Sequence, residues 1–400
     1  MPPAQRGAAR RLMLIAAEPS GDLLGAELMA ALRDRAPGID LIGAGGAEML
    51  HGGLRSLFPT EKLAVMGLKD VFPAIPEVLR RAREAADAAM REQPDAAILI
   101  DSWGFCHQVG KRLRQAGYRG RIVKYATPQV WASRPHRAGV LAGYADYALT
   151  LLPFEPAHFR AAGMKADYAG NSNFQKARNS GDGAAFRAEQ GIGGDAPIVI
   201  LAPGSRRSEL RYLLPVFEQA AERLAARFPD AVFVAPLAPN VAEAVGGAFK
   251  SWAVPVRTIA GDAQKRSAFA AANGALAASG TVTTELALSG TPVVVAYRVG
   301  WVTALWARAV MRTEYVSVLN VIAEEEALPE FLQERATPDA LAAALAALLV
   351  EGPERRRQLA RASAAIAQLE LEGEPAADRA ARLILADLEA TTPSAAAINF

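Results

Sequence analysis

A short turn between two apolar segments carries residue types that suit a phosphate. The apolar run at residues 274–278 ends at Ser279, Gly280 and Thr281, and a helical pattern begins there with Glu285 one turn inside it. A helix N-terminus offers unpaired N–H groups and partial positive charge, Gly280 lets the backbone approach closely, and Glu285 is placed to accept from ribose hydroxyls. The alternative is an ordinary helix cap, with Thr281 as N-cap and Glu285 favoured by the helix dipole.

A second segment, "LAPGSRRSEL" at residues 201–210, follows the same plan. Its apolar run ends in Pro-Gly-Ser, and Ser205, Arg206 and Arg207 stand where a helical pattern starts. An arginine at this place would neutralise a departing diphosphate, a task that other enzymes give to a metal ion. The alternative is a tight turn with solvated arginines. Two such loops in one half of the chain favour a nucleotide-diphosphate site.

The loop after the first apolar run is acidic instead. It contains Glu18, Ser20 and Asp22, and an amphipathic helical pattern follows. The Gly-x-Gly-x-x-Gly pattern of dinucleotide-binding domains does not occur there. Acidic and hydroxyl side chains suit sugar hydroxyls better than a pyrophosphate, so we expect this loop to meet the polar part of a different substrate.

Two further loops follow apolar runs in the first half of the chain. "ILIDSWGF" ends a buried run at Asp101, which makes that carboxylate a candidate general base; an N-cap role for the next helix is the alternative. "YATPQVWASRPHR" combines Tyr125 and Trp131 with basic residues, which predicts a binding loop. A packed tryptophan explains that pattern equally well.

The bulk properties restrict the class of protein. A chain of 400 residues predicts two domains, and a formal net charge of +2 argues against a nucleic-acid partner. The single cysteine, Cys106, excludes an internal disulfide, and the four histidines have no zinc-ligand spacing. We expect residues 1–10 to be a disordered basic leader, because the apolar stretch behind them is too short for a signal peptide. No apolar run reaches the roughly 18–20 residues that span a bilayer.

Short apolar runs alternate with longer amphipathic segments. This alternation, without hairpin signals, predicts an α/β protein with two doubly wound, Rossmann-like domains facing a central cleft. The expected domains are residues 11–175 and 190–365, with a linker near 172–190 and a C-terminal helix and tail at 366–400 that return to the first domain. The apolar runs interpreted as strands lie at residues 11–17, 40–45, 96–101, 121–126, 147–153, 197–205, 231–237, 274–280 and 291–298.

With these loops in place, the sequence resembles the lipid-A-disaccharide synthase family, glycosyltransferases of the GT-B type, over roughly residues 11–390. No single block is specific, but their number and order are. The blocks are "AEPSGDLLGA", "LIGAGGAEM", "LAVMGLKDV", "ILIDS", "PQVWA", "LLPFE", "LAPGSR..E", "ASGTVTTEL", "VVVAYR" and "TEYVSVLN".

The resemblance implies transfer of 2,3-diacylglucosamine from its UDP form to 2,3-diacylglucosamine-1-phosphate, with inversion, to give a β-1,6 disaccharide in lipid A biosynthesis. It also implies an enzyme without metal or other cofactor, in the cytoplasm and peripheral to the inner membrane, and a homodimer. Asp101 matches the family's base, with Glu18 beside it, and the remaining matches divide between the two substrates. The acceptor side takes Ser20, Asp22, Trp131 and Asn171, and the UDP side takes Ser205, Arg206, Ser279, Gly280, Thr281 and Glu285.

The sequence departs from the family's pattern in several loops. Gly104 and Cys106 replace an Asp and an Asn after Asp101, and Asn171 replaces a His. Leu319 replaces a Pro, and Glu325 stands where an Arg is usual. We expect all of these positions to border the cleft, which would indicate an altered acceptor, an altered donor sugar or lost activity.

Two amphipathic segments bear on the membrane. The segment at residues 299–312 carries Trp301, Leu305, Trp306 and Val310 at helical spacing, with Arg308 and Arg312 behind them. Trp and Arg on one helix suit a lipid interface, and a core-facing helix is the alternative. Residues 71–91 form a second, basic candidate with the same alternative.

Three rival functions remain open at this stage. The same chemistry on a different lipid acceptor is one, and a non-catalytic nucleotide-sugar or lipid binder is another. An epimerase with the same two-domain fold is the third. Transfer of the sugar to a lipid separates the first from the second, and an isomerised donor sugar would identify the third.

Overall fold

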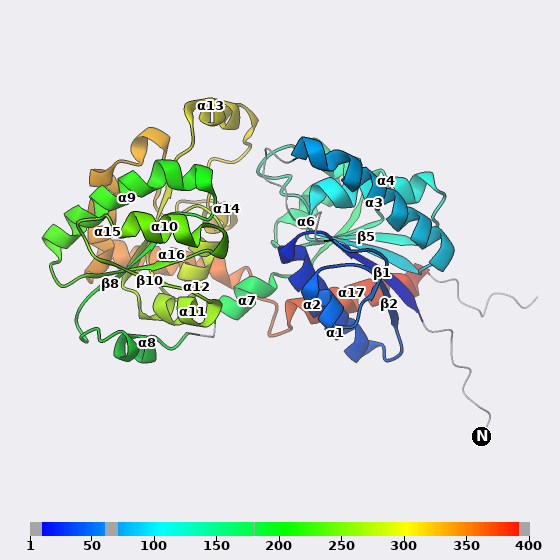
Figure 1. The fold of residues 1–400 in the computed structure, drawn as a ribbon, viewed down its shortest axis with the longest axis horizontal. Helices are drawn as coiled ribbons and strands as arrows, with labels where there is room; N and C mark the ends of the chain where they lie inside the picture. The colour runs from blue at the N-terminus through cyan, green and yellow to red at the C-terminus, as the bar shows by residue number, and fades with distance from the viewer. Residues whose placement is uncertain (1–9, 61–70, 179–180, 392–400) are drawn as a thin grey trace, which may run out of the picture. The chain divides into compact units, whose positions relative to one another are not determined.

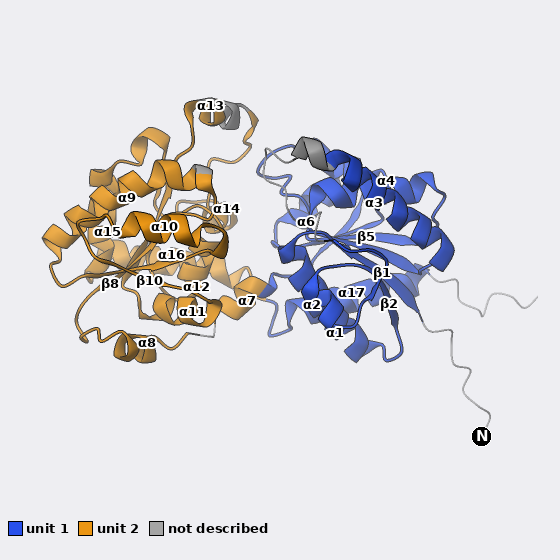
Figure 2. Cartoon of the chain, viewed as in Figure 1, with its two compact units in different colours: residues 1–172, 371–400 blue, residues 173–370 orange. Residues whose placement is uncertain are grey.

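The computed structural model describes residues 10–60, 71–178 and 181–391 (Figure 1). The chain divides into two compact units, one of residues 1–172 and 371–400 and the other of residues 173–370 (Figure 2). Every strand pairing within the described ranges is parallel. The parallel α/β architecture expected from the alternating pattern is therefore confirmed.

The first unit contains a seven-stranded sheet in the order β3-β2-β1-β4-β5-β6-β7. Its strand order reverses direction between β1 and β4, and ligands of doubly wound sheets bind at the carboxyl ends of the strands at such a switch point. The strands are β1 Arg11–Ala16, β2 Asp40–Ala44, β3 Arg55–Ser56, β4 Ala96–Ile100, β5 Arg121–Tyr125, β6 Tyr147–Thr150 and β7 Lys165–Tyr168.

Helices cover both faces of this sheet. One core lies under α3 and α4 and another under α1 and α17, as the alternation of buried side chains on β1 requires. The helices of this unit are α1 Pro19–Arg35, α2 Ala47–His51, α3 Val71–Glu92, α4 Trp103–Gln115, α5 His136–Ala142, α6 Glu155–Ala161 and α17 Ala376–Thr391. The segment proposed as a basic membrane helix is α3, and alanines in its second half, such as Ala82, Ala85 and Ala89, pack in the core.

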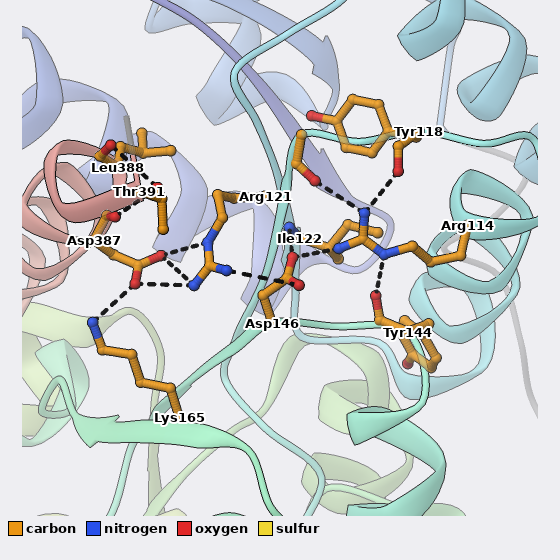
Figure 3. Close-up of polar contacts among 11 residues, drawn as sticks. Arg114, Tyr118, Arg121, Ile122, Tyr144, Asp146, Lys165, Asp387, Leu388 and Thr391 are labelled. Atoms are coloured by element: carbon orange, nitrogen blue, oxygen red, sulfur yellow. Dashed lines mark hydrogen bonds and ion pairs between the residues drawn. The ribbon is translucent and has the colours of Figure 1, made fainter. Parts of the chain in front are cut away.

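The C-terminal helix α17 is fixed to the first unit by a buried carboxylate. Asp387 is 3% exposed and accepts from Arg121 Nε at 2.9 Å, Arg121 Nη2 at 3.0 Å and Lys165 Nζ at 2.9 Å (Figure 3). Arg121 also lies 3.7 Å from Asp146, which pairs with Arg114 (Figure 3). The expected return of the C-terminal helix to the first domain thus has a specific anchor.

The second unit contains a six-stranded sheet in the order β10-β9-β8-β11-β12-β13, with its switch point between β8 and β11. The strands are β8 Ile198–Ala202, β9 Val232–Pro236, β10 Val256–Ile259, β11 Gly274–Ala278, β12 Val293–Tyr297 and β13 Glu330–Leu332. The α-helices of this part of the chain are α7 Ser172–Arg178, α8 Gly183–Glu189, α9 Arg207–Arg227, α10 Ala242–Phe249, α11 Asp262–Ala271, α12 Thr281–Leu288, α13 Trp301–Val310, α14 Val318–Ala323, α15 Pro338–Leu349 and α16 Pro353–Ala367.

The segment expected to be a linker contains two short helices, α7 and α8. Each buries one phenylalanine, Phe174 and Phe186, and Asp182 caps α8 by accepting from Ala185 N at 2.9 Å. A short helix with one apolar anchor has too few apolar residues to show a helical period in the sequence. Residues 1–9 of the expected leader and the tail beyond residue 391 lie outside the described residues.

Candidate active site

The switch point of the first sheet brings together the loops that follow β1 and β4. Ser20, in the first turn of α1, donates its hydroxyl to Asp101 Oδ2 at 2.5 Å. The α1 backbone also approaches closely, because a Cβ added at Gly21 would lie 3.3 Å from Asp101 Cβ. Two residues that the sequence assigned to separate loops therefore share one hydrogen bond.

Asp101 occupies an unusual backbone conformation. Its φ is +52°, and that of Ser102 is +29°, a left-handed region that side chains with a Cβ disfavour. The following helix α4 begins at Trp103 with Ser102 at its N-cap position, and no described side chain caps it. The alternative in which Asp101 caps this helix is therefore wrong. The strained turn instead projects the carboxylate from the end of a buried strand.

A lysine that the sequence analysis left unassigned lies beneath this turn. Lys124, on β5, is 1% exposed, and its Nζ donates to the carbonyl of Asp101 at 2.5 Å. Cys106 lies in the same buried layer and donates to Ile100 O at 3.4 Å. Burial raises the pKa of the Cys106 thiol to about 11, so this cysteine is a packed, unreactive group.

The other acidic residues of the first loop have different surroundings. Glu18 is exposed at the N-cap of α1. Asp22 is buried and accepts three backbone N–H groups at the start of α2, from Gly46 at 2.7 Å, Glu48 at 2.9 Å and Met49 at 3.1 Å. This carboxylate fixes α2 to α1, and its proposed acceptor-side role stays a prediction.

The loop with Trp131 is held by contacts with Phe154 and Glu155. Trp131 packs edge-on against Phe154 with ring centroids 5.3 Å apart and donates its Nε1–H to Glu155 at 3.0 Å. Glu155 also accepts from the backbone N–H groups of Leu151 and Leu152, and burial raises its pKa to about 7. Trp131 is half-buried and held by these contacts, and its proposed acceptor-side role stays a prediction.

Asn171 does not join the Asp101 group within this sheet. It follows β7, the outermost strand, whereas Asp101 follows β4, and β5 and β6 lie between them. Strands are about 4.8 Å apart, so the two loops leave the sheet roughly 14 Å from one another.

In the second unit the switch point brings together the loops after β8 and β11. Arg206 precedes α9, and Glu209 receives both its backbone N–H at 3.3 Å and its guanidinium at 2.7 Å. Asn240 donates to the carbonyl of Ser205 at 2.7 Å. Gly204 has a φ of +114°, and a Cβ there would lie 2.6 Å from Glu209 Oε2, so the turn requires glycine.

The loop after β11 leaves a helix end open. Gly280 is the N-cap of α12, and within the described residues no side chain caps this helix, so the alternative with Thr281 as N-cap is wrong. Ser279 is turned away and donates to Val316 O at 2.7 Å. Glu285 pairs with Lys265 of α11, with Oε2 and Nζ 3.0 Å apart. One of its oxygens is therefore already engaged.

The sequence matches the family described as lipid-A-disaccharide synthetase over residues 12–385. The chain belongs to this family. A lipid-A-disaccharide synthase of Rhodospirillum centenum is 45% identical over 87% of both chains, and one of Paramagnetospirillum magneticum is 42% identical over 94% of this chain and 96% of that protein. The resemblance on which the sequence analysis relied is confirmed.

Solved structures of similar proteins confirm the GT-B fold of this chain. A putative UDP-N-acetylglucosamine 2-epimerase from Listeria monocytogenes superimposes with a TM-score of 0.63 at 15% identity, covering 96% of each chain. The glycotransferase of kitacinnamycin superimposes with a TM-score of 0.61 at 16% identity, covering 95% of this chain and 99% of its own.

The residues that depart from the family pattern do not all lie at the carboxyl ends of the strands, where ligands bind. Cys106 and Leu319 are fully buried, so neither side chain is available to a substrate. Glu325 precedes β13 and therefore lies at the amino end of the sheet, where it pairs with Arg361 at 3.2 Å. The expectation that all departures border the cleft was wrong. Gly104, exposed in the first turn of α4, is the departure beside Asp101.

Two supporting residues, Lys124 and Glu209, were not predicted from the sequence. Lys124 was visible as a charge in the middle of the apolar run "RIVKYA", and Glu209 as the carboxylate three residues after Arg206. A charge inside a buried strand is a signal for a functional role, because burying it costs free energy unless partners compensate.

The part of the chain that the structure describes holds no cluster of three or more His, Cys, Asp or Glu side chains able to bind a metal ion. Across the same ranges, no helix combines the length and apolar character that crossing a bilayer requires. On α13, Trp301 is 78% exposed and Leu305 63% exposed, which excludes a core-facing role for these two side chains. Trp306 and Arg308 of that segment lie outside the described side chains.

Proposed function

We propose that this protein transfers 2,3-diacylglucosamine from its UDP form to 2,3-diacylglucosamine-1-phosphate, with inversion, forming a β-1,6 disaccharide. The observation that carries the proposal is the placement of Asp101 at the switch point of the first sheet, with Ser20 bonded to it. The relatives that are lipid-A-disaccharide synthases support the reaction, and several solved structures of similar fold contain UDP or a UDP-sugar.

The first unit would supply the base. Asp101 would take the proton of the acceptor hydroxyl while that oxygen attacks the anomeric carbon of the donor sugar. Ser20 already donates to Oδ2, which leaves Oδ1 for the incoming proton. Glu18, exposed one turn before Asp22, would orient the acceptor hydroxyls, and a base of this kind contributes about 10²–10⁴-fold in rate.

The second unit would hold the leaving group. As the bond between the anomeric carbon and UDP breaks, negative charge grows on the diphosphate. Arg206 and the open N-terminus of α12 at Gly280 and Thr281 would stabilise that charge. Ser205 and Glu285 would complete the contacts to UDP, Glu285 through the oxygen that Lys265 does not hold.

Mass spectrometry of the products tests the proposal. Purified protein is incubated with UDP-2,3-diacylglucosamine and 2,3-diacylglucosamine-1-phosphate, and the disaccharide phosphate is expected together with UDP. Asp101→Asn should bind UDP as the parent does in calorimetry and form the product about 10²–10⁴-fold more slowly. Asp167→Asn, on β7, is a control for loss of an Asp from the same sheet and should keep turnover. An isomerised UDP-sugar, or UDP binding without transfer in the parent, would contradict the proposal.

We also propose that α13 contacts the membrane surface, because Trp301 and Leu305 expose apolar side chains on one short helix. Leu305→Ser should weaken sedimentation with vesicles of anionic phospholipid, whereas Leu50→Ser, at an exposed leucine on α2, should not. Equal vesicle binding by the parent and Leu305→Ser would refute the proposed membrane contact of α13.

The homodimer rests on the family resemblance alone, and a monomer mass in light scattering at assay concentration would contradict it.

A further inference from the structure

Lys124 is the most deeply buried charge in the described part of the first unit. Its Nζ lies among four backbone carbonyls, those of Leu99 at 3.3 Å, Asp101 at 2.5 Å, Tyr125 at 3.1 Å and Ala126 at 2.9 Å. An ammonium carries three N–H donors and a neutral amine only two, so four acceptors suit the ammonium. Burial lowers the pKa of this ammonium, and the negative charges of Asp101 and Glu18 oppose that shift.

The carbonyl that Lys124 binds most closely belongs to the strained turn. Asp101 and Ser102 both have positive φ, and two such residues in succession are unfavourable unless their surroundings compensate. The backbone N–H of Asp101 is still paired with Tyr125 O at 2.9 Å, as in a strand. Its carbonyl has left the strand pattern and turned toward Lys124. The bond to Nζ is therefore the contact that distinguishes this turn from a continuing strand.

We propose that Lys124 is a positioning residue for Asp101: its buried ammonium holds the left-handed turn that presents the carboxylate to Ser20 and the acceptor. Lys124 touches no substrate in this scheme. The inference rests on the proposed function, because it gives Asp101 the task of the base. Without the cation, the turn would relax toward an ordinary backbone conformation, and the carboxylate would leave its position.

The first test is a double-mutant cycle in kcat. Lys124→Met keeps an unbranched side chain and removes the donors, so kcat should fall about 10²-fold, the cost of displacing a reacting group by about 1 Å. The KM for the UDP-sugar should stay within about twofold, because that substrate is bound by the other unit in the proposed function. Cys106→Ala, which alters the same buried layer without touching the Asp101 carbonyl, should leave kcat near that of the parent.

The cycle is closed with Asp101→Asn. If Lys124 acts through Asp101, the double variant should be no slower than Asp101→Asn alone. Additive losses would show that Lys124 supports the fold in general, and would overturn the inference. A fully active Asp101→Asn would overturn the proposed base itself, and the Lys124 role with it. A slowed Asp101→Asn beside a fully active Lys124→Met would overturn the Lys124 role alone.

The second test relieves the strain directly. Glycine tolerates positive φ, so Ser102→Gly in the Lys124→Met background should restore kcat about tenfold, while Ser102→Gly alone should change it little. No restoration would contradict the proposed mechanism of positioning. If Lys124→Met does not fold by circular dichroism, Lys124→Gln retains an amide donor and takes its place, with the same loss and the same rescue expected. Parent-like kcat in folded Lys124→Gln would overturn the inference.

Discussion

Asp387 provides the sharpest prediction on how the fold supports the proposed site. Asp387→Asn keeps the shape of the side chain and removes its charge, leaving Arg121 and Lys165 without their shared carboxylate (Figure 3). Because α17 packs against α1, which carries Ser20, loss of this anchor should loosen both helices.

The expected loss of stability depends on how deeply Asp387 and its two cationic partners are buried. Breaking a fully buried ion pair costs about 3–5 kcal/mol. Asp387 is 3% exposed, but the Arg121 and Lys165 side chains are 24% and 49% exposed, so water can rehydrate both cations. Arg121 also keeps Asp146 at 3.7 Å. We therefore expect a loss of about 2–3 kcal/mol, or a fall of about 4–12 °C in the unfolding temperature of the first unit.

Hydrogen exchange by mass spectrometry, read peptide by peptide, is the suitable assay, since two units need not unfold together. Exchange should rise in α17 and α1 and stay unchanged in α9. Glu370→Gln is the control, because Glu370 and Arg178 are 46% and 47% exposed and an exposed pair contributes about 0–1 kcal/mol. If Asp387→Asn and Glu370→Gln shift the unfolding temperature equally, the buried anchor is not what holds α17.

Three further predictions concern single residues in or near the loops that follow the strands. Burial raises the pKa of Glu155 from 4.5 to about 7, so the folded state holds the proton more tightly; this stabilising contribution is full below about pH 4.5 and lost as the pH rises through 7. The fluorescence of Trp131 should therefore change with a midpoint near pH 7, and a pH-independent signal from that residue would contradict this. Gly204→Ala should weaken UDP binding about tenfold in calorimetry through strain at φ +114°, whereas Gly247→Ala, with open space around it, should not. Asp22→Asn should lower the free energy of protection against hydrogen exchange at the start of α2 by about 1–3 kcal/mol. If the KM for the acceptor rises while this protection stays unchanged, an acceptor-side role for Asp22 is favoured instead.

The sequence predicted the long, fully apolar strands and the loops after them, because burial on both faces leaves an unbroken apolar run. Those loops prove to lie at the switch points of both sheets, where the strand order reverses. The strands that sequence reasoning missed, β3, β7, β10 and β13, are short edge strands with exposed or half-buried residues. Such strands carry too few apolar positions for a period to emerge.

The site was predictable in its exposed groups and not in its supports. Asp101 and Arg206 could be chosen because a charged residue directly after an apolar run is conspicuous. The bond from Ser20 to Asp101 joins loops 81 positions apart in the sequence, and only the β1–β4 pairing brings them together. Glu325 was misplaced for a related reason: its loop leads into β13, and the direction of that strand puts it at the amino end of the sheet.

The two sheets hold their proposed functional charges in the same way, with opposite signs. In the first, the buried Lys124 ammonium binds the carbonyl of Asp101, whose carboxylate is the proposed base. In the second, the buried Glu209 carboxylate binds the N–H and the guanidinium of Arg206, the proposed diphosphate contact. A buried charge is expensive unless several partners satisfy it, and that expense makes its position well defined. Each switch point thus sets a proposed functional charge beside a fixed buried one, an arrangement that suits a reaction dependent on charge placement.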